Sequence, residues 1–162
     1  MRAETVTIVQ RPVEDVFRFV ADEFFETLPR WDQQTIEVKK TSEGPVNVGA
    51  KGRRVSIGKE GLRVDSEIEV TIYESDRKFS FQAFGTPAGT YSRGGPTPEP
   101  IRIEFTFDFE SRGQETKIVM RVEWDPETIP RVARQALLSA FQGGVRAMAD
   151  RLRTILGSAS RD

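Results

Sequence analysis

The sequence predicts an α+β fold in which one antiparallel sheet of about seven strands is joined by two short helices and one long one. Three observations lead to this prediction. Short stretches of alternating apolar and polar residues follow one another along most of the chain. Helical spacing interrupts them once, after the first strand, and returns only at the end. Consecutive strands joined by short turns pair antiparallel, and helices kept apart from them in the chain are typical of α+β proteins.

The first elements are predicted from a change in hydrophobic period. Apolar and polar residues alternate over 5–10, which indicates a strand. Pro12 then begins a short helix, because apolar residues over 13–20 recur at steps of three and four. Residues 22–31 continue as a second short helix or an irregular turn, and Pro29 is expected to end it.

Six further strands are predicted before the last helix. Their ranges are 34–41, 51–57, 62–74, 78–85, 101–110 and 116–124. Over 101–110, isoleucine and phenylalanine alternate with polar residues without interruption, as in a strand with one buried and one solvated face. Gly, Pro, Thr and Ser dominate residues 85–100, which indicates a long loop within the domain.

Residues 130–156 predict a single amphipathic helix. Pro130 suits the first turn, where a missing N–H costs nothing, and Gly157 suits the position after the last turn. Large apolar residues recur at helical steps, namely Leu137, Phe141, Val145, Met148, Leu152 and Ile155. Small residues form a second stripe beside them, namely Ala133, Ala136, Ala140, Gly144 and Ala147. So wide an apolar face must be covered, so the helix is expected to pack on the sheet.

Length and charge limit the classes of function that the sequence allows. The chain has 162 residues, which suits one domain that buries roughly 70% of its unfolded surface. Lys+Arg 24 against Asp+Glu 25 gives a formal net charge of -1, which argues against a protein that binds nucleic acid through phosphates alone. No apolar run is long enough to span a bilayer, and the first residues show no secretion signal. We therefore predict a soluble cytoplasmic protein with no nucleic-acid partner and no stable membrane insertion.

The residue types present limit the chemistry. The sequence contains no cysteine and no histidine. Thiol chemistry, the commonest general base near neutral pH and the commonest zinc ligand are therefore missing. No catalytic triad or metal-binding set can be assembled, so no catalytic residue and no metal site is predicted. Whether the protein is an enzyme stays open.

Short motifs along nearly the whole chain carry a family resemblance. They are Arg11-Pro12-Val13 with Val16-Phe17, Asp22 followed by Leu28-Pro29 and Trp31, Pro45 with Gly49, Tyr73-Glu74 with Arg77-Lys78-Phe79, and Gly113 with Thr116-Lys117-Ile118. With these motifs the chain resembles the START-like, Bet v 1-like superfamily, also called SRPBCC, and within it the bacterial polyketide cyclase/dehydrase and lipid-transport proteins.

The resemblance implies a helix-grip fold over a single START-like domain, residues 1–162. In this fold a strongly curved antiparallel sheet wraps around the C-terminal helix, and an apolar cavity lies between them. Members of the superfamily bind lipids, sterols, polyketides or plant hormones in this cavity, and some catalyse aromatic ring closure or dehydration. A metal or organic cofactor is not usual, so none is expected here.

The candidate ligand-binding residues combine the inner aromatic face with the long helix. They are Trp31, Phe79, Phe81, Tyr91, Ile103, Phe105, Phe107, Met120, Trp124, Arg134, Leu137, Phe141 and Gly144. Each has a plainer interpretation: the aromatic residues are standard core material, Trp31 can plug the seam between helix and sheet, and Tyr91 can lie in a solvated loop. Arg134 is expected to orient a ligand's carboxylate or phenolate, or else to extend its charge to water.

The leading functional prediction is binding or transport of a small hydrophobic or amphipathic molecule between the sheet and the last helix. One alternative is a polyketide aromatase/cyclase or dehydratase that uses the same cavity. A second alternative is an interaction module whose apolar face is only core. The sequence leaves the ligand and the oligomeric state open, and a homodimer is compatible with it.

Overall fold

The computed structural model describes residues 1–57, 61, 63–86 and 99–157. Within these residues, seven antiparallel strands form one sheet in the order β1-β7-β6-β5-β4-β3-β2. The strands are β1 (Arg2–Val9), β2 (Thr35–Lys40), β3 (Lys51–Ile57), β4 (Arg63–Glu74), β5 (Lys78–Gly85), β6 (Ile101–Arg112) and β7 (Glu115–Trp124). The helices are α1 (Val13–Phe17), α2 (Phe24–Trp31) and α3 (Arg131–Leu152). This arrangement confirms the predicted helix-grip fold.

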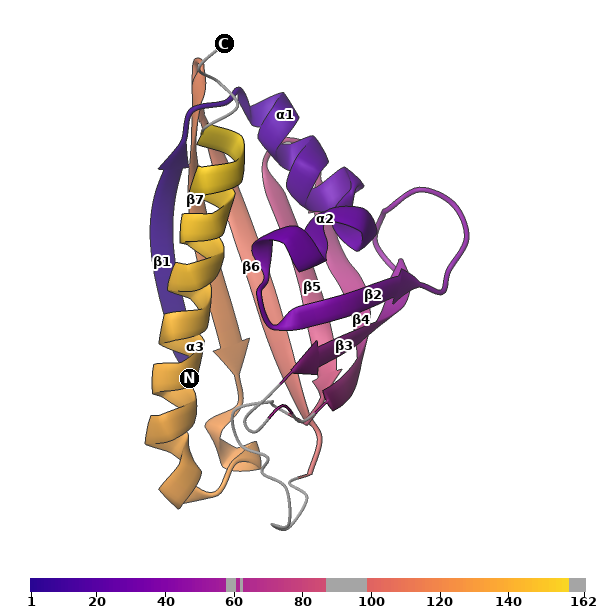
Figure 1. Ribbon diagram of the computed structural model, residues 1–162, viewed down its shortest axis with the longest axis vertical. Helices are drawn as coiled ribbons and strands as arrows, with labels where there is room; N and C mark the ends of the chain where they lie inside the picture. Colours follow the sequence, from indigo (N-terminus) through magenta and orange to yellow (C-terminus); the bar gives the residue numbers. More distant parts are fainter. Residues whose placement is uncertain (58–60, 62, 87–98, 158–162) are drawn as a thin grey trace.

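The helices form two groups that cover different parts of the concave side of the curved sheet (Figure 1). The long helix α3 runs alongside β1 and β7, and α1 and α2 lie in front of the sheet, with α2 next to β2. A π-helical segment, Arg18–Asp22, joins α1 to α2, and a second one, Arg153–Gly157, continues α3. The candidate site described below lies in the part of the concave face between α3 and the start of β2.

Aromatic rings fill the space beneath α1 and α2. The Phe24 ring of α2 lies 5.2 Å from that of Phe79 and 4.7 Å from that of Phe81, measured between centroids. Trp31 meets Phe107 of β6 edge to face at 5.6 Å. Rings in such tilted and edge-to-face contacts stabilise a core beyond the area they bury. This half of the concave side is therefore closed.

The helix α2 differs from the prediction at Pro29, which lies inside the helix and does not end it. The ring removes one backbone hydrogen bond, since proline has no N–H. The turn that follows is closed by the Asp32 N–H, which donates to the Leu28 carbonyl at 2.9 Å. Because Leu28 and Trp31 are both buried on the core side, packing holds the last turn in place.

The helix α3 is buried unevenly along its length. In its first turns Val132 is 94% exposed, whereas Val145, Met148 and Leu152 in its second half are buried. The second half therefore anchors α3 to the sheet, and the first half stands at the surface. None of the helices within the described residues is long and apolar enough to cross a bilayer.

Candidate ligand-binding site

A cavity of about 70 Å³ lies between the middle of α3 and the sheet. Its helix wall is apolar, with large side chains beside two small residues, and is formed by Leu137, Ala140, Phe141, Gly144, Val145 and Met148. Its sheet wall includes Ala83 of β5 and Ile103 and Phe105 of β6. A third part is polar and comes from Gln34, which precedes β2, and from Arg54, Ser56 and Ser66 of β3 and β4. The cavity reaches the surface, since Ala140 and Gln34 are exposed.

Gly144 keeps the helix wall open. A Cβ atom built at this position would meet nothing within 4 Å. A glycine inside a helix costs roughly 1 kcal/mol relative to alanine, so a reason other than helix stability is needed for it. The neighbouring Gly143 also has free space but is exposed and does not line the cavity. The two glycines therefore provide one position in the site and one matched position outside it.

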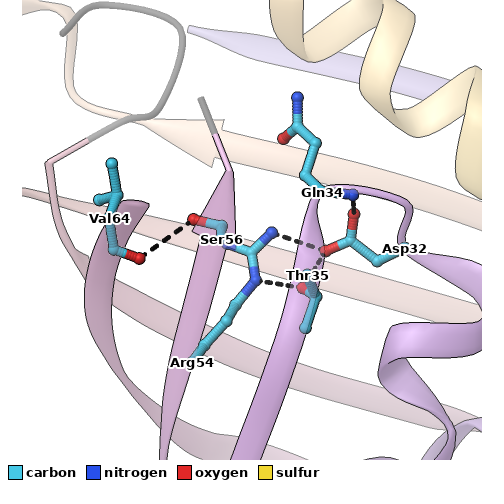
Figure 2. A network of polar contacts seen from close by, with 6 residues as sticks. All are labelled: Asp32, Gln34, Thr35, Arg54, Ser56 and Val64. Carbon is cyan, nitrogen blue, oxygen red and sulfur yellow. Dashed lines mark hydrogen bonds and ion pairs between the residues drawn. The ribbon is translucent and has the colours of Figure 1, made fainter. Parts of the chain in front are cut away.

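The polar end of the cavity is organised by a buried ion pair (Figure 2). An Nη atom of Arg54 lies 2.6 Å from the Asp32 carboxylate, and the Arg54 Nε donates to the Thr35 hydroxyl at 2.5 Å. That hydroxyl donates to the same carboxylate at 2.6 Å, and the Gln34 backbone N–H donates to its other oxygen at 3.2 Å. The side chains of Arg54 and Asp32 are 14% and 4% exposed. The pair fixes the guanidinium at the cavity wall.

Two serines and Thr86 also line the cavity. The Ser56 hydroxyl donates to the Val64 carbonyl across the β3–β4 pairing at 3.3 Å. Ser66 is buried, and within the described part of the chain its hydroxyl has no hydrogen-bond partner. A buried hydroxyl without a partner costs free energy, so a ligand atom that bonds to it is favoured. The Gln34 side chain points away from the ion pair (Figure 2) and adds an amide to the rim.

The structure divides the predicted ligand-binding residues into groups. Those that line the cavity are Ile103, Phe105, Leu137, Phe141 and Gly144. Phe81 and Trp124 stand one layer behind, because Phe81 stacks on Phe105 at 4.9 Å and Trp124 contacts Phe141 at 4.6 Å, both between ring centroids. Four others are at most 1% exposed within the core and do not line the cavity, namely Trp31, Phe79, Phe107 and Met120.

Of the two polar candidates, Arg134 lies outside the cavity and Tyr91 is not among the described residues. Arg134 lies in the first turn of α3, where its Nε donates to the Ile129 carbonyl at 3.1 Å and an Nη atom lies 3.9 Å from Glu127. It therefore stabilises the turn before α3 and is not part of the cavity lining. Tyr91 falls outside the described residues.

Comparison with known proteins places the chain in a family. The sequence matches the family described as polyketide cyclase / dehydrase and lipid transport over residues 1–157. The chain belongs to this family. No curated protein matches the sequence. Family membership supports a ligand-binding or cyclase role.

Solved structures agree with the helix-grip, Bet v 1-like fold. TTHA0849 from Thermus thermophilus superposes with a TM-score of 0.71 at 19% identity, covering 99% of this chain and 99% of that one. Ara h 8.0201 gives 0.62 at 12% identity, covering 94% and 97%. BexL, a di-domain ARO/CYC protein from the BE-7585A biosynthetic pathway, gives 0.64 at 17% identity, with 95% of this chain matching 45% of BexL. At these identities the likeness shows the fold alone.

The polar residues at the cavity were missed by sequence reasoning, although a signal for some of them existed. In β3 the inward positions are occupied by Gly52, Arg54 and Ser56, and no large apolar residue is among them. In β4, Ser66 interrupts the inward series of Val64 and Ile68. Polar residues at inward positions of a strand indicate either a site or a buried network.

The chemistry available at the cavity is hydrogen bonding. Among the described residues that line it, Arg54 is the one charged side chain, and carboxylate, lysine and tyrosine are absent. The described residues also contain no group of three or more carboxylates that could hold a metal ion. The guanidinium and the hydroxyls can hold and orient an oxygen atom of a bound molecule.

Proposed function

We propose that the protein binds a compact, mostly apolar molecule with one polar group in the cavity between α3 and the sheet. The observation that carries the proposal is the cavity itself, with an apolar wall on α3 and a built polar end at Arg54 and Ser66. Apolar surface buried there contributes about 25 cal/mol per Å² to affinity. The polar end sets the orientation of the ligand.

The size of the cavity limits the ligand. Sites for drug-sized molecules usually measure about 300–1,000 Å³, whereas this one measures about 70 Å³ without a ligand. The ligand is therefore small, or one end of a longer molecule enters and the rest lies along the exposed rim at Ala140 and Gln34. Either form suits a carrier of small amphipathic molecules. The cavity favours this function over an interaction module whose apolar face is only core.

A second function is favoured by the position of Arg54. A guanidinium held at the wall of a cavity can donate hydrogen bonds to a carbonyl oxygen and polarise it. In an aromatase/cyclase or dehydratase, the cavity would act mainly by holding a flexible chain in a reactive conformation. Formation of a cyclised or dehydrated product from a polyketide-like substrate would distinguish this function from binding alone.

The proposal is tested by comparing Gly144→Leu with Gly143→Leu. Both changes replace an α3 glycine by a good helix former, so each is expected to preserve or raise helix stability. At position 144 the new side chain enters the cavity, and at position 143 it points to solvent. Native mass spectrometry of protein purified from its own host would show whether a small molecule co-purifies.

We expect the wild type and Gly143→Leu to retain the bound molecule and Gly144→Leu to lose it. Fluorescence of Trp124 gives a second measurement, because its ring contacts Phe141 of the cavity wall. Equal retention by both variants would place the ligand elsewhere. The absence of any bound molecule, together with no response to an added panel of small aromatic compounds, would refute the binding function.

A further inference from the structure

We infer that the ligand presents an uncharged oxygen, a carbonyl or a hydroxyl, to the polar end of the cavity, and that a carboxylate is excluded there. The inference rests on the proposed function, since it concerns the ligand of the same cavity. It differs from what a lone arginine at a cavity wall would predict, which is an anionic ligand.

The charge of Arg54 is already compensated. Its Nη atom lies 2.6 Å from the Asp32 carboxylate, and both side chains are largely buried. Among the described residues that line the cavity, no second cation accompanies Arg54. The net charge of the polar end is therefore zero.

Hydrogen-bonding capacity nevertheless remains. A guanidinium carries five N–H donors, and the bonds that Arg54 makes within the described part of the chain go to Thr35 and Asp32 alone. The Ser66 hydroxyl is buried at 9% exposure, and no described residue bonds to it. The remaining N–H donors of Arg54 and the Ser66 hydroxyl can therefore bond to one further oxygen atom, which the ligand supplies.

A charged oxygen is disfavoured at this position by the cost of desolvation. A carboxylate that reached Arg54 would give the buried cluster a net negative charge, because the Asp32 carboxylate already occupies one side of the guanidinium. Transfer of a charge from water is not offset unless an opposite charge is available to it. A carbonyl or hydroxyl gains the hydrogen bonds without that cost.

Three probes of nearly equal size and shape test the inference, namely acetophenone, benzoate and cumene. They present a carbonyl, a carboxylate and no polar group. Titration of the wild-type protein at neutral pH, followed by amide chemical shifts of Ile103, Phe105 and Gly144, would give their relative affinities. We expect acetophenone to bind about tenfold tighter than benzoate and several-fold tighter than cumene, in line with the usual net gain from one hydrogen bond.

Removing the Asp32 charge, which compensates Arg54, should reverse the preference for acetophenone over benzoate. Asp32→Asn keeps an oxygen acceptor for Arg54 and Thr35 but leaves the guanidinium charge unpaired, so benzoate is expected to gain about tenfold or more relative to acetophenone. Asp108→Asn is the matched control, because Asp108 pairs with Arg121 on the outer side of the sheet. It should leave the preference unchanged.

Ser66→Ala provides a variant that keeps the ion pair intact. It should weaken acetophenone several-fold and leave cumene unchanged, so the inference stays testable if Asp32→Asn does not fold. Binding of cumene and acetophenone with equal affinity, or tighter binding of benzoate to the wild type, would overturn the inference while the binding function stands. If none of the probes shifts the cavity amides, the inference falls, and the binding function falls with it only if no small molecule co-purifies with the protein either.

Discussion

A single phenol connects the segment after α1 to the sheet. Tyr73 of β4 donates its hydroxyl hydrogen bond to the Asp22 carboxylate, and its ring meets Phe17 edge to face at 5.3 Å. The hydrogen bond to Asp22, with some help from burial and from the negative charges of Asp22 and Asp76, raises the pKa of Tyr73 from 10.0 to about 12. The folded protein therefore keeps this proton to a higher pH than the unfolded chain does.

This difference predicts a pH-dependent effect of Tyr73→Phe. Below about pH 10 both states hold the proton, and the bond contributes its full amount, about 0.5 kcal/mol for so exposed a pair. As pH rises from 10.0 towards about 12, the unfolded phenol loses its proton first, so the advantage of the wild type shrinks. Urea unfolding of the wild type and of Tyr73→Phe at about pH 8 and about pH 11, at fixed salt, measures the difference between their free energies of unfolding. If the difference between the two proteins did not change with pH, the raised pKa of Tyr73 and its cause, the hydrogen bond to Asp22, would be contradicted.

At the scale of elements, α2 docks on β3 at a glycine. A Cβ atom added to Gly52 would lie 2.4 Å from the Phe25 ring of α2 and 2.7 Å from the Lys39 backbone carbonyl of β2. The ring could turn aside, but the carbonyl belongs to the β2–β3 pairing. The absence of a side chain at position 52 therefore lets α2 and the edge strand approach β3 together.

Gly52→Ala is expected to lower the free energy of unfolding by about 1–3 kcal/mol, the usual cost of overpacking. Gly143→Ala is the control, because a Cβ there meets nothing within 4 Å and alanine favours the helix by about 1 kcal/mol. Urea unfolding should thus move the two variants in opposite directions. A neutral or stabilising Gly52→Ala would show that β2 can shift freely.

Local patterns predicted the elements well and the site only in part. The strands over 51–57 and 78–85 have the expected bounds, since alternation is a property of each strand alone. The pairing of Asp32 with Arg54 joins the end of α2 to the third strand, and no local pattern encodes such a contact. Similarly, Phe105 lines the cavity and Phe107 does not, although both face inward on β6, because α1 and α2 cover one end of the sheet. That division depends on the packing of the whole chain.

At the scale of the whole molecule, α3 acts as a wall fixed at one end. Its second half is anchored by Val145, Met148 and Leu152, and the π-helical segment after it is held by Arg11, whose Nε donates to the Leu156 carbonyl at 3.2 Å. Its first half borders the cavity but buries little apart from Leu137. Space for a ligand larger than about 70 Å³ is therefore most easily gained by movement of this first half.

Hydrogen exchange along α3 tests this asymmetry. Amides in residues 131–140 should exchange faster than those in 145–152 by a factor on the order of ten or more, because local opening follows the number of buried apolar contacts that must break. Saturation with acetophenone should slow exchange over 137–144, where the ligand would contact Leu137 and Phe141, and leave the anchored half unchanged. Gly144→Leu should reproduce this slowing without any ligand, since its side chain would occupy the same space. Peptide-resolved mass spectrometry gives the rates, and uniform exchange along α3 would mean that the helix opens as one unit and that the cavity does not grow from its free end.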